Sequence, residues 1–158
     1  MGCLGNIVEK NNKQPQQVSP QNKEAAIKAI AKFEDGVAEL EKEKNEHMDN
    51  LDQYIENYKN KIAQYNQNKT PQLKKELASF KSQLLSYANN FENSVKMKAD
   101  FLNDNIKAMI VVQKGYFQVD AKKQMDELSN KVETIKNESS QQFAKKRSEL
   151  NSLSNTYN

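Results

Sequence analysis

The chain has 158 residues, of which 36% are hydrophobic and 28% charged, and its formal net charge is +3 at pH 7. It contains 4 Gly and 3 Pro, which leaves few residues for the turns of a sandwich, a barrel or a doubly wound sheet. One His and one Cys exclude an intrachain disulfide, a His/Cys metal cage and a Cys–His catalytic pair with any redundancy. Composition therefore predicts an all-α protein built from long helices.

The first stretch, residues 1–19, opens with Met1, Gly2 and Cys3, which offer two acceptors for fatty acids. Removal of Met1 would expose the Gly2 amine to myristate, and the Cys3 thiol could accept palmitate. A single myristoyl chain binds membranes only marginally, with an association constant of roughly 10⁴ M⁻¹, so stable anchoring needs a second signal. The few lysines nearby form a weak basic patch, which leaves Cys3 as that second signal.

This Met1-Gly2-Cys3 start resembles that of doubly acylated peripheral membrane proteins such as G-protein α-subunits and Src-type kinases. The resemblance covers about six residues and departs from the usual Ser or Thr at Asn6. It implies myristate on Gly2, palmitate on Cys3, and a location on the cytoplasmic face of a eukaryotic membrane, the plasma membrane or an extension of it. Residues 7–19 are polar and unpatterned, so they predict a flexible tether. The alternative is a coincidental start with an idle thiol.

The first predicted helix covers residues 20–68. A Ser N-cap followed by Pro20 marks its start. Apolar residues recur at steps of three and four over residues 30–40 and again over residues 51–65. Between these runs the phase slips near Lys44, as a stutter would produce. The segment has 7 Lys and 10 Asp or Glu, so it is net acidic.

The second predicted helix covers residues 71–114, because Thr70-Pro71 repeats the same start signal. Its apolar residues then alternate at steps of four and three, the spacing of a coiled coil, at Leu73, Leu77, Phe80, Leu84, Tyr87 and Phe91. Residues 69–119 carry 8 Lys and 4 Asp or Glu, so this basic stretch can pair with the acidic first helix, within the chain or between copies. Gly115 either caps the helix or lies inside one continuous helix.

The third predicted helix covers residues 120–155, with Asp120 as its N-cap and apolar positions from Met125 to Leu153. Short connections make consecutive helices antiparallel. The predicted fold of residues 20–158 is therefore a helical hairpin or an elongated three-helix bundle with coiled-coil-like seams. Narrow seams bury few residues per helix, so such helices often complete their packing through other copies.

Residues 106–119 depart from the narrow-seam pattern, because their apolar side chains would surround a helix on most sides. Three interpretations stay open: a core where the three helices meet, a contact between copies, and insertion into lipid between Lys107 and Lys114. The predicted self-assembly residues are Ile106, Met109, Ile110, Val111, Val112, Tyr116 and Phe117.

Catalytic and metal sites are not expected. His47 has acidic neighbours but no second His, so it is interpreted as an ordinary surface or seam residue. The chain has no Glu-x-x-His motif, Gly-rich phosphate loop, nucleophile elbow or zinc spacing, so we expect no enzymatic activity, cofactor or small-molecule substrate. Basic doublets such as Lys74-Lys75 are typical of solvated helix faces, and nucleic acid is not an expected partner.

These features together predict a lipid-anchored helical scaffold that self-assembles into a coat on a membrane and shapes or stabilises it. The plan resembles, by architecture only, helical membrane-remodelling proteins of the ESCRT-III and BAR types. Those families present a strongly basic membrane face, whereas the first helix here is net acidic, so lipid anchors would replace that attraction. The alternatives are a membrane-tethered coiled-coil adaptor that recruits a protein partner, and a soluble coiled-coil cytoskeletal component.

Overall fold

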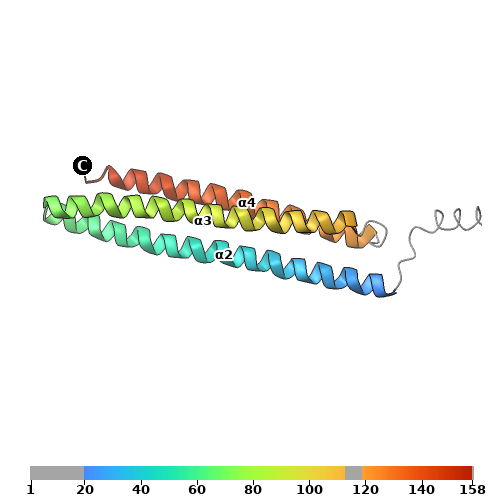
Figure 1. Ribbon diagram of the computed structural model, residues 1–158. Coiled ribbons are helices and arrows are strands. Elements are labelled where there is room, and N and C mark those ends of the chain that lie inside the picture. Colours follow the sequence, from blue (N-terminus) through green and yellow to red (C-terminus); the bar gives the residue numbers. More distant parts are fainter. Residues whose placement is uncertain (1–19, 113–118, 158) are drawn as a thin grey trace, which may run out of the picture. The chain divides into compact units, whose positions relative to one another are not determined.

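Three long helices make up the computed structural model of the chain (Figure 1), which describes residues 20–112 and 119–157. Helix α2 covers Pro20–Gln67, α3 covers Pro71–Val112 and α4 covers Val119–Ser154. No strand occurs in the ranges that the structure describes. The predicted all-α fold is confirmed. Both ends of α2, the start of α3 and the end of α4 lie within about one residue of their expected positions, inside the usual uncertainty of helix boundaries, whereas the predicted end of the second helix at residue 114 lies outside the described residues.

Local sequence explains where α2 and α3 meet. Pro occupies the first position of both helices, where it leaves no N–H unpaired and its fixed φ suits the helix. The Thr70 hydroxyl caps α3 by accepting a hydrogen bond from the backbone N–H of Leu73 at 3.2 Å. At the end of α2, the N–H of Asn68 donates to the carbonyls of Gln64 and Tyr65. These local bonds define both helix ends.

Each helix contributes one segment to each of two compact units. Unit 1 combines the chain up to Val37 with Phe101–Val132. Unit 2 combines Ala38–Asp100 with Glu133–Asn158. Both units are therefore bundles of three helix segments.

Unit 1 has an apolar core to which all three helices contribute. A polar contact joins α3 to α4, because the Ser129 hydroxyl donates a hydrogen bond to the Asn103 side-chain oxygen. Gly36 lets α2 and α3 approach closely, since a Cβ at this position would lie 3.1 Å from Leu102 Cδ1. The buried apolar residues are Ala26, Ile30, Phe33, Val37, Ile106, Met125 and Val132.

Unit 2 has a longer core that is rich in aromatic rings. Along α2 from His47 to Tyr58, the ring partners on α3 run backward from Phe91 to Phe80. The two helices are therefore antiparallel in this unit, as the short connection predicts. Its buried apolar residues are Leu40, Met48, Leu51, Ile55, Tyr58, Ile62, Tyr65, Leu77, Leu84, Ala88, Val95, Ala99, Ile135, Phe143, Leu150 and Tyr157.

Helix α4 is also antiparallel to α3 in unit 2. The Lys81 ammonium donates to the Ser154 hydroxyl at 2.9 Å. Further along α3, Glu92 forms an ion pair with Arg147, in which the guanidinium nitrogen and the carboxylate oxygen are 2.5 Å apart. A later residue of α3 thus contacts an earlier residue of α4, as antiparallel helices require. With α2, these segments make unit 2 a bundle of three helix segments.

Burial along α2 follows steps of three and four with one irregularity. Leu40, Lys44 and Met48 are buried in succession, which gives two consecutive steps of four. Such an irregularity is a stutter, and it occurs where the sequence pattern predicts one. The stutter puts Lys44 into a core position with 5% exposure, where its ammonium lies 3.7 Å from the carboxylate of Glu138.

Candidate functional site

The predicted lipidation positions, Gly2 and Cys3, lie outside the described residues. The same holds for Tyr116 and Phe117 of the predicted self-assembly set, and for the side chain of Val112. These parts of the sequence analysis stay predictions.

The other four predicted self-assembly residues lie near the end of α3, in unit 1. Ile106 is fully buried, Met109 and Ile110 are half-buried, and Val111 is 72% exposed. Ile106 thus belongs to the core of unit 1 in the way that the three-helix interpretation expects. Of these four side chains, Val111 is the one most available to a partner.

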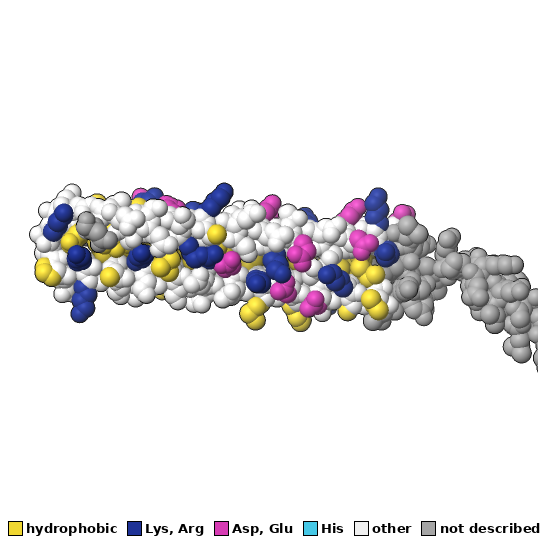
Figure 2. Space-filling model, turned by 90° about the horizontal axis from the view of Figure 1, so that it is seen from above, with side chains coloured by type: hydrophobic (Ala, Val, Ile, Leu, Met, Phe, Trp, Pro, Cys, Tyr) yellow, Lys and Arg dark blue, Asp and Glu magenta, His cyan; other side chains and the backbone are white. Residues whose placement is uncertain are grey.

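Two further exposed apolar residues of α3 were missed by the sequence analysis. Met97, in unit 2, is 71% exposed, and Phe101, in unit 1, is 70% exposed. Figure 2 shows hydrophobic side chains that stand out among charged ones at the surface. The sequence signal for these two residues is their position in the helical repeat. The apolar spacing of the core passes through Val95 and Leu102, so Met97 and Phe101 fall outside the core positions. Large apolar residues off the core spacing indicate a second apolar face.

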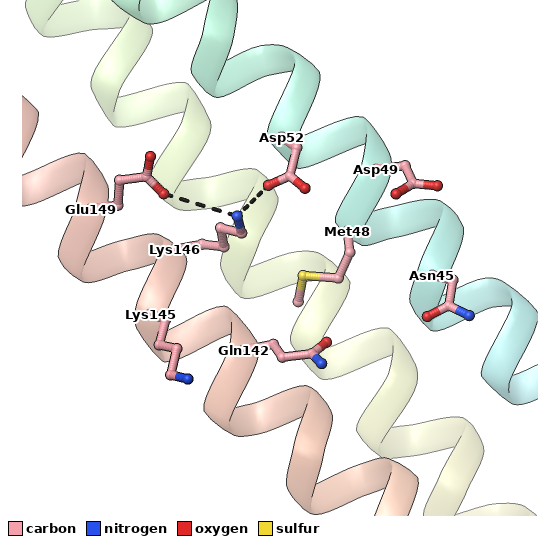
Figure 3. Close-up of a pocket in the computed structure, with 8 residues that line it drawn as sticks. All are labelled: Asn45, Met48, Asp49, Asp52, Gln142, Lys145, Lys146 and Glu149. Carbon is pink, nitrogen blue, oxygen red and sulfur yellow. Dashed lines mark ion pairs between the residues drawn. The ribbon is translucent and has the colours of Figure 1, made fainter.

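Unit 2 has an open groove between α2 and α4, with a volume of about 750 Å³ (Figure 3). The residues that line it are Asn45, Met48, Asp49 and Asp52 from α2, and Gln142, Lys145, Lys146 and Glu149 from α4. The ionisable groups among these eight residues are the carboxylates of Asp49, Asp52 and Glu149 and the ammonium groups of Lys145 and Lys146.

The charges of this groove are mixed. Lys146 forms ion pairs with Asp52 across the groove and with Glu149 on its own helix, the second at 3.9 Å. Asp49 and Lys145 are exposed and come from opposite walls. Because groups of both signs are exposed to solvent, the groove favours no single charged ligand, and its ion pairs tie α2 to α4.

His47 is partly buried between α2 and α3 of unit 2. Its ring stacks on Phe91 with the ring centroids 4.4 Å apart, and its Nε2 lies 3.6 Å from a carboxylate oxygen of Glu43. Glu43 also pairs with Lys98 of α3. His47 is thus a seam residue, and the acidic α2 pairs with the basic α3 within the chain at this point.

A pair of buried hydroxyls joins α2 to the segment that follows α4. The side-chain oxygens of Tyr58 and Tyr157 are 2.7 Å apart, and the ring of Tyr65 meets that of Tyr157 edge-on. Burial of Tyr58, together with the hydrogen bond to Tyr157, raises the pKa of its phenol well above the ordinary value. The Tyr58 phenol therefore stays neutral, and the hydroxyl pair stabilises the end of unit 2.

Within residues 20–112 and 119–157, no cluster of His, Cys, Asp and Glu side chains could hold a metal ion. The helices that the structure describes include none with an apolar stretch long enough to span a bilayer. Comparison of the chain with protein-family models, curated proteins and solved structures gave no match. The function must therefore be inferred from the residues of this chain.

Proposed function

We propose that the protein is a lipid-anchored helical scaffold that self-assembles into a coat on the cytoplasmic face of a eukaryotic membrane and shapes or stabilises that membrane. The observation that carries the proposal is the sequence Met1-Gly2-Cys3, which puts two acyl acceptors side by side. Two acyl chains give stable anchoring where one gives marginal binding. The proposal requires translation to begin at Met1, so that Gly2 becomes the N-terminal residue.

The surface of the helices supports a scaffold that associates with other copies. Met97, Phe101 and Val111 are each at least 70% exposed. Covering such apolar side chains with another surface removes them from water, which favours association. Anchoring confines the copies to a membrane and so raises their effective concentration. Weak contacts between copies would then suffice for assembly on the membrane.

The charge distribution supports anchoring by acyl chains over anchoring by electrostatic attraction. Residues 20–68 are net acidic, and an acidic helix gains nothing from the negative surface of a cytoplasmic leaflet. Some of its carboxylates are already occupied within unit 2, where Asp52 pairs with Lys146 and Glu43 with Lys98. The proposal therefore assigns attachment to the acyl chains and not to the first helix.

The test is electron microscopy of enzymatically acylated protein mixed with vesicles of phosphatidylcholine and phosphatidylserine. We expect regular striations or uniform tubules, and we expect Gly2→Ala to abolish them. Cys3→Ser should weaken binding without abolishing it, because a single myristoyl chain remains. Intact-mass spectrometry of protein from eukaryotic cells would establish whether both acyl groups are attached.

Two outcomes would contradict the proposal in different ways. Smooth vesicles that carry bound but unordered protein would contradict the coat and favour a membrane-tethered adaptor. If the acylated wild type bound vesicles as weakly as Gly2→Ala, the lipid anchor would be contradicted and the soluble coiled-coil alternative would be favoured.

A further inference from the structure

Unit 2 carries opposite charges on two adjoining stretches of the chain. Residues 38–58 of α2 contain 7 Asp or Glu and 2 Lys, a net charge of −5. Residues 59–81, which continue through the α2–α3 turn into α3, contain 6 Lys and 1 Glu, a net charge of +5. All of these residues belong to unit 2, so one compact unit carries both charges.

The positive charge gathers at the end of unit 2 where α2 turns into α3. Lys69, Lys74 and Lys75 are exposed there, and none of them forms an ion pair with the described part of the chain. Lys59, by contrast, pairs with Glu149 of α4. Figure 2 shows dark-blue Lys or Arg side chains at this end of the unit. We refer to Lys69, Lys74 and Lys75 as the basic tip.

The stability of α3 does not account for the lysine doublet in the basic tip. Helix α3 has no acidic residue in its first turn, and Lys74 and Lys75 are its fourth and fifth residues. The N-terminal end of a helix has a partial positive charge, so it favours carboxylates over ammonium groups. The doublet therefore opposes the dipole of its own helix, as expected of residues whose role lies in a contact with another molecule.

Helix α2 carries the complementary charge on one side. Glu39, Glu46 and Asp49 are exposed, and they have no ion pair among residues 20–112 and 119–157. They recur at steps of seven and three residues, so they lie along one side of the helix. Lys42 lies on the same side between Glu39 and Glu46, which leaves three negative charges against one positive charge. We refer to Glu39, Glu46 and Asp49 as the acidic face.

The basic tip and the acidic face of one copy are too far apart to pair with each other. Asp49 precedes Tyr58 by nine residues, and Lys75 precedes Phe80, the ring partner of Tyr58, by five. At 1.5 Å per residue, Asp49 and Lys75 lie about 21 Å apart along unit 2. The screening length at physiological ionic strength is about 8 Å, so the attraction between them is weak. Both patches are therefore available to another molecule.

We propose that the basic tip of one copy docks on the acidic face of a second copy. The inference rests on the self-association in the proposed function and names the contact between copies. Because the tip and the face are different surfaces, each copy offers one of each. Successive contacts of this kind extend an array of copies, whereas a self-complementary contact would stop at a dimer. An extended array is what a coat requires.

A second copy accounts for both patches, whereas anionic lipid accounts for one. The negative surface of a cytoplasmic leaflet would attract the basic tip. The same surface would repel the acidic face and leave it without a partner. The charges of residues 38–58 and 59–81 are equal and opposite, so two copies of this chain complement each other. Charge complementarity therefore selects a second copy as the occupant.

The contact should be weak in solution. Exposed ion pairs contribute little each, and salt screens them. Complementary charges determine which surfaces meet more than they add affinity. Confinement of anchored copies to a membrane raises their effective concentration, so the contact should become populated there.

The test is cross-linking of concentrated, unacylated protein with a carbodiimide, which joins an ammonium group directly to a carboxylate that touches it. An equal mixture of unlabelled and isotope-labelled wild type should give peptides that join the basic tip to the acidic face. Products that combine one labelled and one unlabelled peptide arise only between two copies, and mass spectrometry identifies them. Raising the salt concentration from about 0.05 M to about 0.5 M should lower their yield at least about tenfold, because screening increases.

Charge reversal supplies the second arm of the test. The tip variant combines Lys74→Glu with Lys75→Glu, and the face variant combines Glu46→Lys with Asp49→Lys. Each variant alone should lower the yield of cross-links between tip and face at least about tenfold, because like charges then meet. An equal mixture of the two should restore the cross-links, since the face variant keeps the basic tip and the tip variant keeps the acidic face.

Two controls separate a specific contact from changes in net charge or folding. Lys122→Glu combined with Lys123→Glu reverses an exposed doublet of unit 1, with the same change of charge as in the tip variant. This control should leave the yield unchanged. Circular dichroism should show equal helicity for all variants, because every substituted residue is exposed.

The outcomes separate this inference from the proposed function. Absence of cross-links between tip and face, or failure of the mixture to restore them, would overturn the contact. Striated vesicles of the acylated wild type would then still support a coat with another interface. Cross-links together with smooth vesicles would support the contact and contradict the coat.

Vesicles of phosphatidylcholine and phosphatidylserine test lipid as the occupant of the basic tip. If the unacylated wild type bound them, the tip variant did not, and no cross-links formed between copies, the tip would be assigned to lipid and the inference would be overturned.

Discussion

Unit 1 and unit 2 are both three-helix bundles, but different kinds of contact join their helices. In unit 2, ring stacking and ion pairs join one helix to another, as Glu92 with Arg147 illustrates, and a hydroxyl pair joins Tyr58 of α2 to Tyr157 beyond the end of α4. These contacts are directional, so a small shift of one helix breaks them. They select one packing arrangement for unit 2.

The described part of unit 1 depends more on apolar burial. Its core has the polar contact between Asn103 and Ser129, whereas its ion pairs, such as Lys28 with Glu24, run along a single helix. Apolar side chains of suitable size tolerate small rearrangements, so packing there is less narrowly specified. The comparison teaches that the two units should respond differently to the same type of substitution.

The largest expected effect comes from truncating the core of unit 2. Phe143 is fully buried, so Phe143→Ala should lower the free energy of unfolding by about 3–5 kcal/mol through lost burial and a cavity. Urea unfolding followed by circular dichroism measures this change. Phe101→Ala is the matched control, since Phe101 is 70% exposed and its loss should change the free energy by less than about 0.5 kcal/mol. Equal effects of the two substitutions would contradict the assignment of core and surface.

The hydroxyl pair of unit 2 gives the next largest effect. Tyr157→Phe removes the partner of the buried Tyr58 hydroxyl and should lower the free energy of unfolding by about 1–2 kcal/mol. Tyr54→Phe is the control, because Tyr54 is half-buried and packs against Tyr87 through its ring. If Tyr157→Phe lowered the free energy of unfolding less than Tyr54→Phe does, the hydroxyl pair would not be a specific stabilising contact of unit 2.

The same pair predicts a pH dependence of stability. Burial, and then the bond to Tyr157, raises the pKa of Tyr58 in the folded protein above the value of about 10 expected when unfolded. A raised folded pKa means that the contribution to stability is complete below about pH 10 and is lost as the pH rises above it. The melting temperature should therefore fall more steeply above about pH 10 in the wild type than in Tyr58→Phe. Parallel curves would contradict this role of Tyr58.

Most of the fold follows from local sequence. Pro20, and Thr70 with Pro71, mark helix starts because the capping chemistry is contained within one turn. The stutter near Lys44 is visible because apolar spacing records which face of a helix is buried.

The parts that could not be predicted depend on contacts between distant residues. Tyr157 lies beyond the last helix, and its bond to a residue 99 positions away leaves no trace in local spacing. The exposure of Phe101 was missed for a related reason, because a spacing pattern identifies one seam and does not say which other apolar residues stay uncovered. The division into two units likewise follows from packing in space.

A moderate effect should come from the charge buried at the stutter of unit 2. Lys44 is 5% exposed, whereas the side chain of its partner Glu138 is 55% exposed and stays hydrated without it. Lys44→Met should therefore raise the free energy of unfolding by about 1 kcal/mol, because it removes the desolvation of the ammonium. Lys42→Met, at an exposed position of the same helix, should change it by less than about 0.5 kcal/mol. A loss of stability in Lys44→Met would show that this ion pair stabilises unit 2 as well as specifying it.

The smallest expected effect tests whether unit 1 adapts. Gly36→Ala gains up to about 1 kcal/mol of helix propensity, but the new Cβ would lie 3.1 Å from Leu102 Cδ1. If unit 1 packs through adaptable apolar contacts, Leu102 can move by a few tenths of an ångström, and the net gain should be about 0.5 kcal/mol. Ala38→Gly, at an exposed position of the same helix, measures the propensity term alone and should cost about 1 kcal/mol. Destabilisation by Gly36→Ala would mean that α2 and α3 are held as rigidly in unit 1 as in unit 2. The two units would then differ in the chemistry of their contacts and not in their tolerance of substitution.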